Sequence, residues 1–249
     1  MVDCPPKRRY NTNINSKQGA KTMFKLLSTA NPKIQKGTKM GYLSFILHLA
    51  PADLSGRETC PKRTAGCTAA CLNTAGRGGM FKRGETTNMI QKARIRKTVM
   101  YFEQRDEFLA TLEADIRKAI KFAERQGLIP VFRLNGTSDL SVEKWGIIEK
   151  FPTVQFYDYT KVLGRKVAHL PNYHLTFSKA DGNDSDVAEA LLQGMSVVAV
   201  YDAIPEGVPS ADETDLRFLD PKGIMLGLKA KGRAKKDYSG FVIRVKEVA

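Results

Sequence analysis

Three of the four cysteines of this chain lie within twelve residues, as Cys60, Cys67 and Cys71 of the segment CPKRTAGCTAAC. Cys4 lies far away near the N-terminus, and this uneven number of thiols argues against a closed disulfide framework. Met1 is not followed by the apolar segment of a signal peptide. We therefore expect a reducing cytoplasm, where clustered cysteines serve metal binding or catalysis rather than disulfide bonds.

The spacing of the three cysteines, Cys-x6-Cys-x3-Cys, favours an iron–sulfur cluster over zinc. A structural zinc site has four ligands and uses Cys-x2-Cys pairs, and no fourth cysteine or suitably placed histidine follows here. Three thiolates instead suit a four-iron cluster with one open iron. Lys62, Arg63 and Arg77 would offset its negative charge, and Gly66 leaves backbone amides free for its sulfides. The alternative is three buried structural cysteines, which a polar loop accommodates poorly.

Polar residues recur where apolar segments end, and in a parallel α/β fold such exits meet at one edge of the sheet. Most of these residues also suit helix caps and turns. Lys161 and Lys179 do not, because the helix dipole disfavours cations at a helix start. We therefore predict a mouth that binds a small or anionic ligand, lined by Arg133, Asn135, Ser138, Asp139, Tyr159, Lys161, Ser178 and Lys179.

Apolar segments and helical patterns must alternate to bring these residues together. Strands are predicted at 42–50, 130–134, 154–159, 173–178, 196–201, 223–228 and 240–245. Two long helices are expected between residues 85 and 127, and shorter ones at 141–150, 161–170 and 186–194. The alternation indicates an α/β fold with a parallel sheet, wound as a partial or closed barrel. The two long helices would form its first crossover, and the cysteines would lie at the C-terminal ends of its strands.

A cysteine triplet after the first strand of such a barrel resembles the radical SAM superfamily. That resemblance implies a four-iron cluster, held by three cysteines, whose open iron binds S-adenosylmethionine (SAM). More closely, the chain is similar to a phage family known as gene product eighty-eight. The similar segments are LAPADLSGRETCPKRTAGCTAACLNTAGRG, ARIRKT, FRLNGTSDL, VQFYDYTK, NYHLTFSKA and DPKGIMLGLKAKG, within residues 40–232. This resemblance implies a viral iron–sulfur protein with a radical-SAM-like barrel that works in the host bacterial cytoplasm.

The chain departs from the superfamily at two points. Its cysteine gaps are six and three residues, not three and two, and Ala70 rather than an aromatic residue precedes Cys71. The Gly-Gly-Glu motif of the second strand end is replaced by NGTSD, in which Asp139 supplies the carboxylate. The sequence therefore predicts cluster binding by Cys60, Cys67 and Cys71, with Cys4 not a ligand, and only weak or absent SAM binding.

Charge divides the chain into two parts. The formal net charge is +14, and residues 1–40 hold nine basic side chains against the single acid Asp3. We interpret 1–40 as a basic N-terminal arm, which is either a solvated segment or a nucleic-acid contact. We expect residues 41–249 to form a single barrel domain in which the cluster loop occupies 51–79. No apolar run is long enough to span a membrane, and the oligomeric state is not predicted.

Two classes of function follow from these features. In the first, the chain is an enzyme whose open iron binds SAM or a related ligand at the barrel mouth. In the second, the chain is a non-enzymatic protein that senses redox state or associates with nucleic acid through its basic arm. A salt-dependent affinity for nucleic acid that is lost with residues 1–40 would favour the second class.

Overall fold

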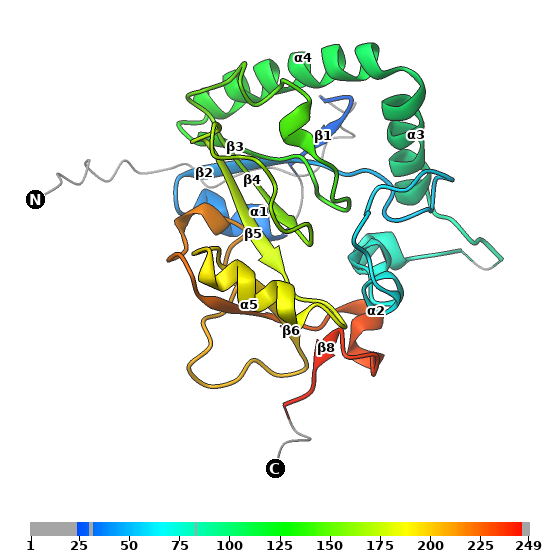
Figure 1. Ribbon diagram of the computed structural model, residues 1–249. Helices are drawn as coiled ribbons and strands as arrows, with labels where there is room; N and C mark the ends of the chain where they lie inside the picture. Colours follow the sequence, from blue (N-terminus) through cyan, green and yellow to red (C-terminus); the bar gives the residue numbers. More distant parts are fainter. Residues whose placement is uncertain (1–23, 30–31, 83, 246–249) are drawn as a thin grey trace, which may run out of the picture.

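The computed structural model describes residues 24–29, 32–82 and 84–245 of the chain. Their core is an eight-stranded sheet in which β2 to β7 follow one another in chain order and all pair in parallel (Figure 1). β1 pairs antiparallel with β2, and β8 pairs in parallel with β6. The strands are β1 (Leu27–Ser28), β2 (Tyr42–Leu47), β3 (Ile129–Arg133), β4 (Gln155–Thr160), β5 (Tyr173–Ser178), β6 (Val197–Tyr201), β7 (Met225–Lys229) and β8 (Val242–Ile243).

The predicted α/β class and parallel sheet are confirmed. In the part of the chain that is described, hydrogen bonds do not close the sheet, since its path runs from β1 to β7 without returning. β8 pairs with β6 at Val200 and Tyr201, and the same two residues of β6 also pair with β7. A closed barrel is therefore not formed by strand pairing.

Two long helices connect β2 with β3, as predicted. The helices of the fold are α1 (Pro32–Thr38), α2 (Ala65–Ala69), α3 (Met89–Glu103), α4 (Arg105–Glu124) and α5 (Asp184–Leu192), with short 3₁₀ segments η1 (Leu72–Thr74), η2 (Gly76–Gly79), η3 (Val142–Lys144), η4 (Arg217–Leu219) and η5 (Gly232–Lys236). Asn88 caps α3 by accepting a hydrogen bond from the Gln91 amide. α4 ends just before Gly127, whose φ is +67°.

The core forms because α4 has an apolar stripe with helical spacing. Phe108, Leu112 and Ile116 are fully buried on this stripe and pack against the sheet. There Phe45 stacks on Phe132 and Phe132 on Phe156, each with ring centroids 5.4 Å apart. The opposite face of the sheet is covered by the connection between β6 and β7. This connection contributes Leu216 and Phe218 to a cluster with Val131 and Tyr157.

Two predicted helices are not formed. Residues 141–150 contain only the three-residue η3, and residues 161–170 form turns and irregular backbone. Gly146 and Gly164 have φ values of +67° and +74°, a conformation that a right-handed helix does not allow. Side chains from both segments are held by buried polar groups instead, as described below. The strands at both ends of these connections nevertheless match the predicted ones.

Part of the predicted basic arm belongs to the packed fold. Phe24, Leu26 and Leu27 are buried, and the buried carboxylate of Asp115 on α4 accepts hydrogen bonds from the amides of Leu26 and Leu27 at 2.7 and 3.2 Å. The arm before residue 24, including Cys4, lies outside the described residues. Among the described helices, none has the length and apolar character needed to cross a membrane.

Candidate functional site

After β2 ends at Leu47, the chain leaves the sheet and comes back to its edge at Thr59, directly before the cysteine segment. The buried Thr59 fixes this return, because its hydroxyl donates to the carbonyl of Ala50 at 2.6 Å and its amide to that of Ala52 at 3.0 Å. The Thr59 carbonyl in turn accepts from the amide of Asp139, beyond β3, at 2.8 Å. Cys60 is therefore attached to the exits of both β2 and β3, where the sequence placed it.

The second cysteine is held by a contact with the exit of β5. Thr64 caps α2 by accepting from the amide of Cys67 at 3.1 Å, and its hydroxyl donates to the carboxylate of Asp181. That carboxylate also accepts from the amide of Gly66 at 3.1 Å. A Cβ atom at Gly66 would lie 2.0 Å from the Ser239 hydroxyl, so the loop packs tightly against the C-terminal segment.

Backbone amides donate to two of the three sulfur atoms. The Sγ of Cys60 accepts from the amide of Ala52 at 3.3 Å, and the Sγ of Cys71 from the amide of Asn73 at 3.5 Å. Ala52 has φ of +51° and is the sole non-glycine residue with positive φ among those described. Strained backbone of this kind gathers at functional sites.

Both thiols are difficult to ionise in the metal-free chain. Burial raises the pKa of the Cys60 thiol to about 11 and also raises that of Cys71. Cys71 lies within electrostatic range of Cys60 and Cys67, and of the cations Arg94 and Lys161. The three cysteines are free thiols, and within the described ranges no group of three or more His, Cys, Asp or Glu side chains is arranged to hold a metal ion.

Arg94 on α3 approaches the cysteine segment without a carboxylate partner. One guanidinium nitrogen, Nη1, donates to the side-chain oxygen of Asn73. The Nε atom is buried and has no hydrogen-bond partner. No described acidic residue forms an ion pair with Arg94. Burial lowers the pKa of this guanidinium, and the nearby Cys71 partly opposes that shift.

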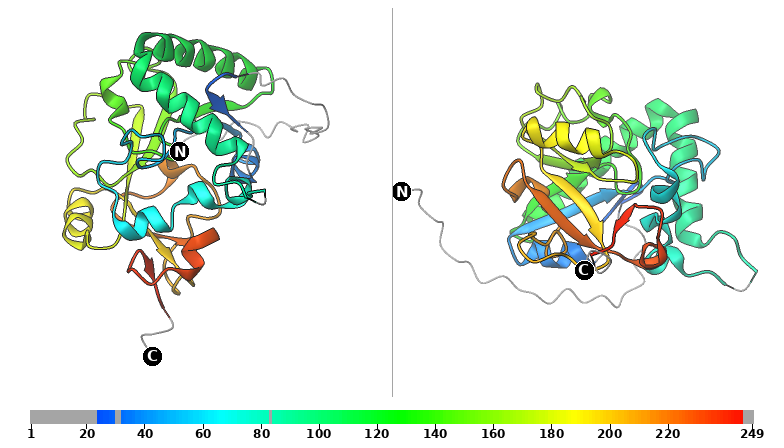
Figure 2. Two further views of the ribbon diagram at one scale, coloured as in Figure 1. Left: turned by 90° about the vertical axis from the view of Figure 1, so that its right-hand side faces the viewer. Right: turned by 60° about the horizontal axis from the view of Figure 1, so that its bottom comes forward.

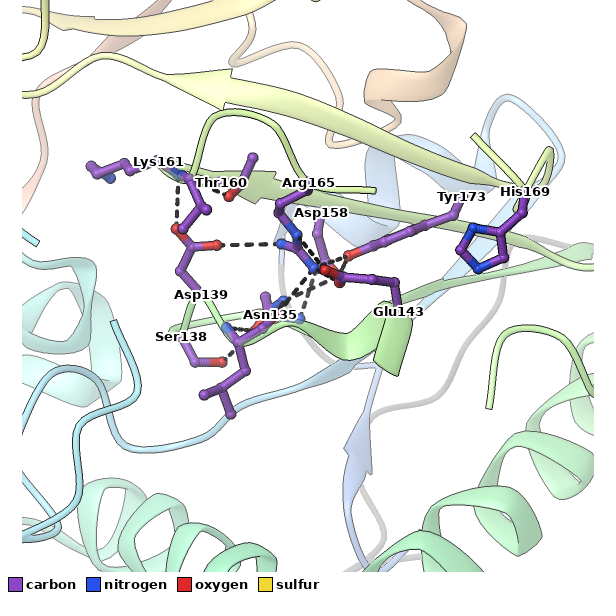
Figure 3. A network of polar contacts seen from close by, with 12 residues as sticks. Asn135, Ser138, Asp139, Glu143, Asp158, Thr160, Lys161, Arg165, His169 and Tyr173 are labelled. Atoms are coloured by element: carbon purple, nitrogen blue, oxygen red, sulfur yellow. Dashed lines mark hydrogen bonds and ion pairs between the residues drawn. The ribbon is translucent and has the colours of Figure 1, made fainter. Parts of the chain in front are cut away.

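At the exit of β3, the predicted ligand residues are occupied by contacts within the protein (Figure 3). The side-chain oxygen of Asn135 accepts from the Ser138 hydroxyl at 2.8 Å and from the Leu140 amide at 2.9 Å. Its Nδ2 donates to the Leu140 carbonyl at 2.9 Å. Asp139 accepts from the amide of Lys161 at 2.7 Å. These contacts fix the loop between β3 and β4.

Arg165 completes this network from the following connection. Its guanidinium pairs with Asp139, at 3.4 Å, and with Glu143, and all three side chains are at most 12 % exposed (Figure 3). Asp158 lies beside them, fully buried, and accepts from the Asn135 amide at 2.7 Å and the Tyr173 hydroxyl at 3.0 Å. Burial raises the pKa of Asp158 to about 6.

Arg133 and Tyr159 face the connection between β6 and β7. The Arg133 guanidinium pairs with Asp215 at 3.1 Å and lies 4.5 Å above the centre of the Tyr159 ring. The Tyr159 hydroxyl donates to the same carboxylate at 3.4 Å. Beside them is His48, whose pKa falls to about 3 because it is buried and close to Arg94, Arg133 and Lys97.

The two predicted lysines have different surroundings. Lys161 Nζ donates to the Ser178 hydroxyl at 3.2 Å and forms no ion pair with a described residue. Lys179 pairs with Asp184, in the first turn of α5, at 2.8 Å. Of these two lysines, only Lys161 has no carboxylate partner among the described residues, and it lies within electrostatic range of Cys71.

The chain matches one protein family over residues 20–245. It belongs to the Gene product 88 family. This membership confirms the closer of the two resemblances, but the family's description names neither a reaction nor a cofactor. No match to the chain is found among curated proteins or among solved structures. The iron–sulfur cluster and the ligand-binding roles of the strand-end residues stay predictions for this Gene product 88 protein.

Sequence reasoning missed four residues that shape the site of this Gene product 88 protein: Ala52, Thr59, Arg94 and Asp181. Ala52 acts through its backbone conformation and Thr59 through hydrogen bonds to nearby backbone groups, neither of which the residue type reveals. Arg94 follows Lys92 and precedes Arg96 and Lys97, so it resembles an exposed helix cation. One feature of the sequence could have indicated Arg94: α3 has no acidic residue before Glu103, so these cations have no ion-pair partner on their own helix.

Proposed function

We propose that this chain is an iron–sulfur protein that holds a four-iron cluster through Cys60, Cys67 and Cys71 in the host bacterial cytoplasm. The cluster would lie at the C-terminal edge of a partial, radical-SAM-like barrel. The order of β2 to β7 along the chain is the winding of α/β barrels and supports this architecture. One observation carries the proposal: near the cysteine sulfurs lie two directed backbone amides and a half-buried cation that has no carboxylate partner among the described residues.

The unpartnered Arg94 fits an anionic group at this place. Arg94 is half-buried, and partial desolvation of a guanidinium without a counter-charge is unfavourable, so its position favours an anion beside it. Three thiolates and a cluster together carry net negative charge, and Arg94 and Lys161 both lie within electrostatic range of Cys71. Neutral thiols would leave both cations without a counter-charge from these cysteines.

The amides of Ala52 and Asn73 fit the same group. Hydrogen bonds to cluster sulfurs are one of the means by which proteins set the properties of iron–sulfur sites. The amide of Ala52 reaches Cys60 because of its left-handed backbone, which costs of the order of 1 kcal/mol in a non-glycine residue. Binding iron would ionise thiols whose pKa values burial raises, so metal uptake would release protons.

A cluster is also larger than a single metal ion. Each cysteine of a four-iron cluster binds a different iron. Sulfurs that hold such a cluster therefore stand farther apart than four ligands at about 2.3 Å around one zinc ion. The cysteines attach to separate strand exits, Cys60 near β3 and Cys67 near β5, and this separation suits the larger group.

The test is iron content after anaerobic expression with excess iron. We expect a brown protein with about four irons per chain. Serine at Cys60, Cys67 or Cys71 should remove the absorption and most of the iron, while Cys4→Ser, the matched control, should keep both. Circular dichroism of each iron-free variant shows whether the fold persists. One zinc per chain, or full iron retention in Cys67→Ser, would contradict the proposal.

A second measurement separates the two functional classes. When bound, the cluster would supply redox chemistry and an open iron. We expect weak or absent SAM binding, because the cysteine spacing differs from that of the superfamily and Asp139 is occupied by Lys161 and Arg165. Release of 5′-deoxyadenosine with a SAM-dependent change in the reduced EPR spectrum would identify an enzyme. An unchanged spectrum would favour a redox-sensing protein.

A further inference from the structure

A loop beside the cysteine segment projects from the body of the protein and carries both apolar and basic side chains. It connects η2 with α3 and extends away from the sheet (Figure 1 and Figure 2). Met80 is 70 % exposed and Phe81 is 36 % exposed, and the neighbouring Arg77 and Lys82 are also exposed. Exposed apolar side chains on a projecting loop indicate a contact surface.

The base of this loop is fixed to α3. The Asn88 side chain donates to the carbonyls of Gly78, at 2.8 Å, and Met80, at 3.1 Å. Gln91 donates to the same Gly78 carbonyl at 3.2 Å. A Cβ atom at Gly78 would lie 2.5 Å from the Asn73 carbonyl oxygen, so the base is closely packed. The loop therefore keeps a defined position next to the exposed side of α3.

The same side of the molecule has an excess of unpaired positive charge. The exposed cations Lys62, Arg77, Lys82, Lys92 and Arg96 form no ion pair with another described residue. Other basic residues nearby are neutralised: Arg57 pairs with Glu103, and Arg63 pairs with Asp53 and Glu58. In the left view of Figure 2, α3 (green) and the cysteine segment (cyan) both lie on the side toward the viewer. We name the described residues of the projecting loop and the exposed residues of α3, within 77–82 and 84–96, the loop–α3 surface.

We propose that the loop–α3 surface binds single-stranded nucleic acid. Its unpaired cations would neutralise backbone phosphates. Phe81 would stack on an unpaired base, with Met80 beside it, which is how single strands are held without sequence preference. The bases of a duplex are not available for such stacking. This assignment is independent of the cluster and differs from the predicted contact through the N-terminal arm.

A matched pair of triple variants tests the electrostatic part. One combines Lys82→Ala, Lys92→Ala and Arg96→Ala. The control combines Lys118→Ala, Lys121→Ala and Arg125→Ala. These three exposed cations lie on α4 and at its C-cap, about 20 Å or more along the helix from its junction with α3. Both lose the same charge and keep the full chain, including its N-terminal segment. Circular dichroism confirms that each is folded.

The affinity of each variant for a fluorescent single DNA strand of about 16 nucleotides is measured by fluorescence anisotropy. The first triple variant should lower affinity at least tenfold at low salt, and should reduce the slope of log K against log salt by about 2. The control should leave the slope unchanged. Phe81→Ala should weaken binding about 5- to 100-fold without changing the slope.

Three results would overturn the assignment. Equal losses in the two triple variants would indicate only general attraction to a basic protein. A duplex that binds as tightly as the single strand would remove the role of stacking. Polyglutamate that displaces the strand as well as unlabelled DNA of equal charge would indicate an acidic protein as partner. Iron content does not enter any of these measurements, so the outcome is separate from that of the cluster proposal.

Discussion

The exits of β2 and β3 are neighbours at one edge of the sheet, and both are rich in polar residues. At the β3 exit, Asn135, Asp139 and Arg165 find their partners within the protein. At the β2 exit, Arg94 has no carboxylate partner among the described residues, and the Sγ atoms of Cys60 and Cys71 accept long hydrogen bonds from backbone amides. A buried Nε without a hydrogen-bond partner does not distinguish the exits, because Arg94 and Arg133 both have one. Hydrogen-bonded buried groups hold a structure together, whereas a charged group without a counter-charge calls for an explanation, of which a bound ligand is one. We therefore propose ligand binding for the β2 exit and a stabilising role for the β3 exit.

The largest expected effect concerns the β3 exit. Arg165→Met removes a buried cation and leaves Glu143, which is 8 % exposed, without its counter-charge. Breaking such a pair costs about 3–5 kcal/mol, so urea unfolding should show a large loss of stability. Arg117→Met is the control, because its side chain is 59 % exposed in a surface pair with Glu113. Its loss should stay within about 1 kcal/mol. Similar losses in both variants would contradict the assignment.

The strands and the two long helices could be predicted because their apolar spacing is local. The stripe of Phe108, Leu112 and Ile116 has helical periodicity, and the strands are short runs of apolar residues. Residues 141–150 and 161–170 have similar local patterns but do not form α-helices. Gly146 and Gly164 have positive φ in these segments, and the long-range pairs of Arg165 with Glu143 and Asp139 connect them. A single sequence does not show which side chains meet.

The position of the site was predictable for a related reason. Parallel strands bring their C-terminal ends together, so the exits of β2 and β3 had to be neighbours. Which polar residues are free at those exits was not predictable. Asn135 and Arg94 are both polar and near the sheet edge, yet only the structure shows that Asn135 is saturated by Ser138 and Leu140.

An intermediate effect comes from pH, with opposite signs at the two exits. The pKa of His48 falls from 6.5 to about 3, so the unfolded chain takes up a proton that the folded chain refuses. This contribution to stability is complete above pH 6.5 and is lost as pH falls. The pKa of Asp158 rises from 3.8 to about 6, so its contribution is complete below pH 3.8 and is lost as pH rises.

Between pH 4 and pH 6 the two contributions oppose each other. His48→Gln should remove the contribution that increases with pH. As pH rises from 4 to 6, the unfolding free energy of this variant should therefore fall by up to about 2–3 kcal/mol relative to that of the wild type. The unfolding free energy of Asp158→Asn should increase by a similar amount relative to the wild type as pH rises over the same range. Urea unfolding at several pH values measures both. Parallel profiles for the two variants would show that the exits do not differ in this way.

The smallest expected change in stability concerns Arg94. Arg94→Met removes a half-buried guanidinium that has no ion pair with a described residue, so no charged group loses its counter-charge. The unfolding free energy of the iron-free chain should therefore change by less than about 1 kcal/mol, in contrast to Arg165→Met. If Arg94 instead serves a cluster, the variant should hold iron about 10- to 100-fold less tightly in competition with a chelator.

Arg94→Lys separates charge from geometry at this position. Lysine keeps the positive charge beside Cys71 but lacks the planar guanidinium that reaches Asn73. Partial recovery of iron retention would indicate that the charge acts on the bound group, and no recovery would indicate that Arg94 works by positioning Asn73 and its amide. A strongly destabilised Arg94→Met with unchanged iron retention would reverse the comparison. Arg94 would then belong with Arg165 among the residues that hold the fold, and the β2 exit would have lost the side chain that most directly indicates a ligand.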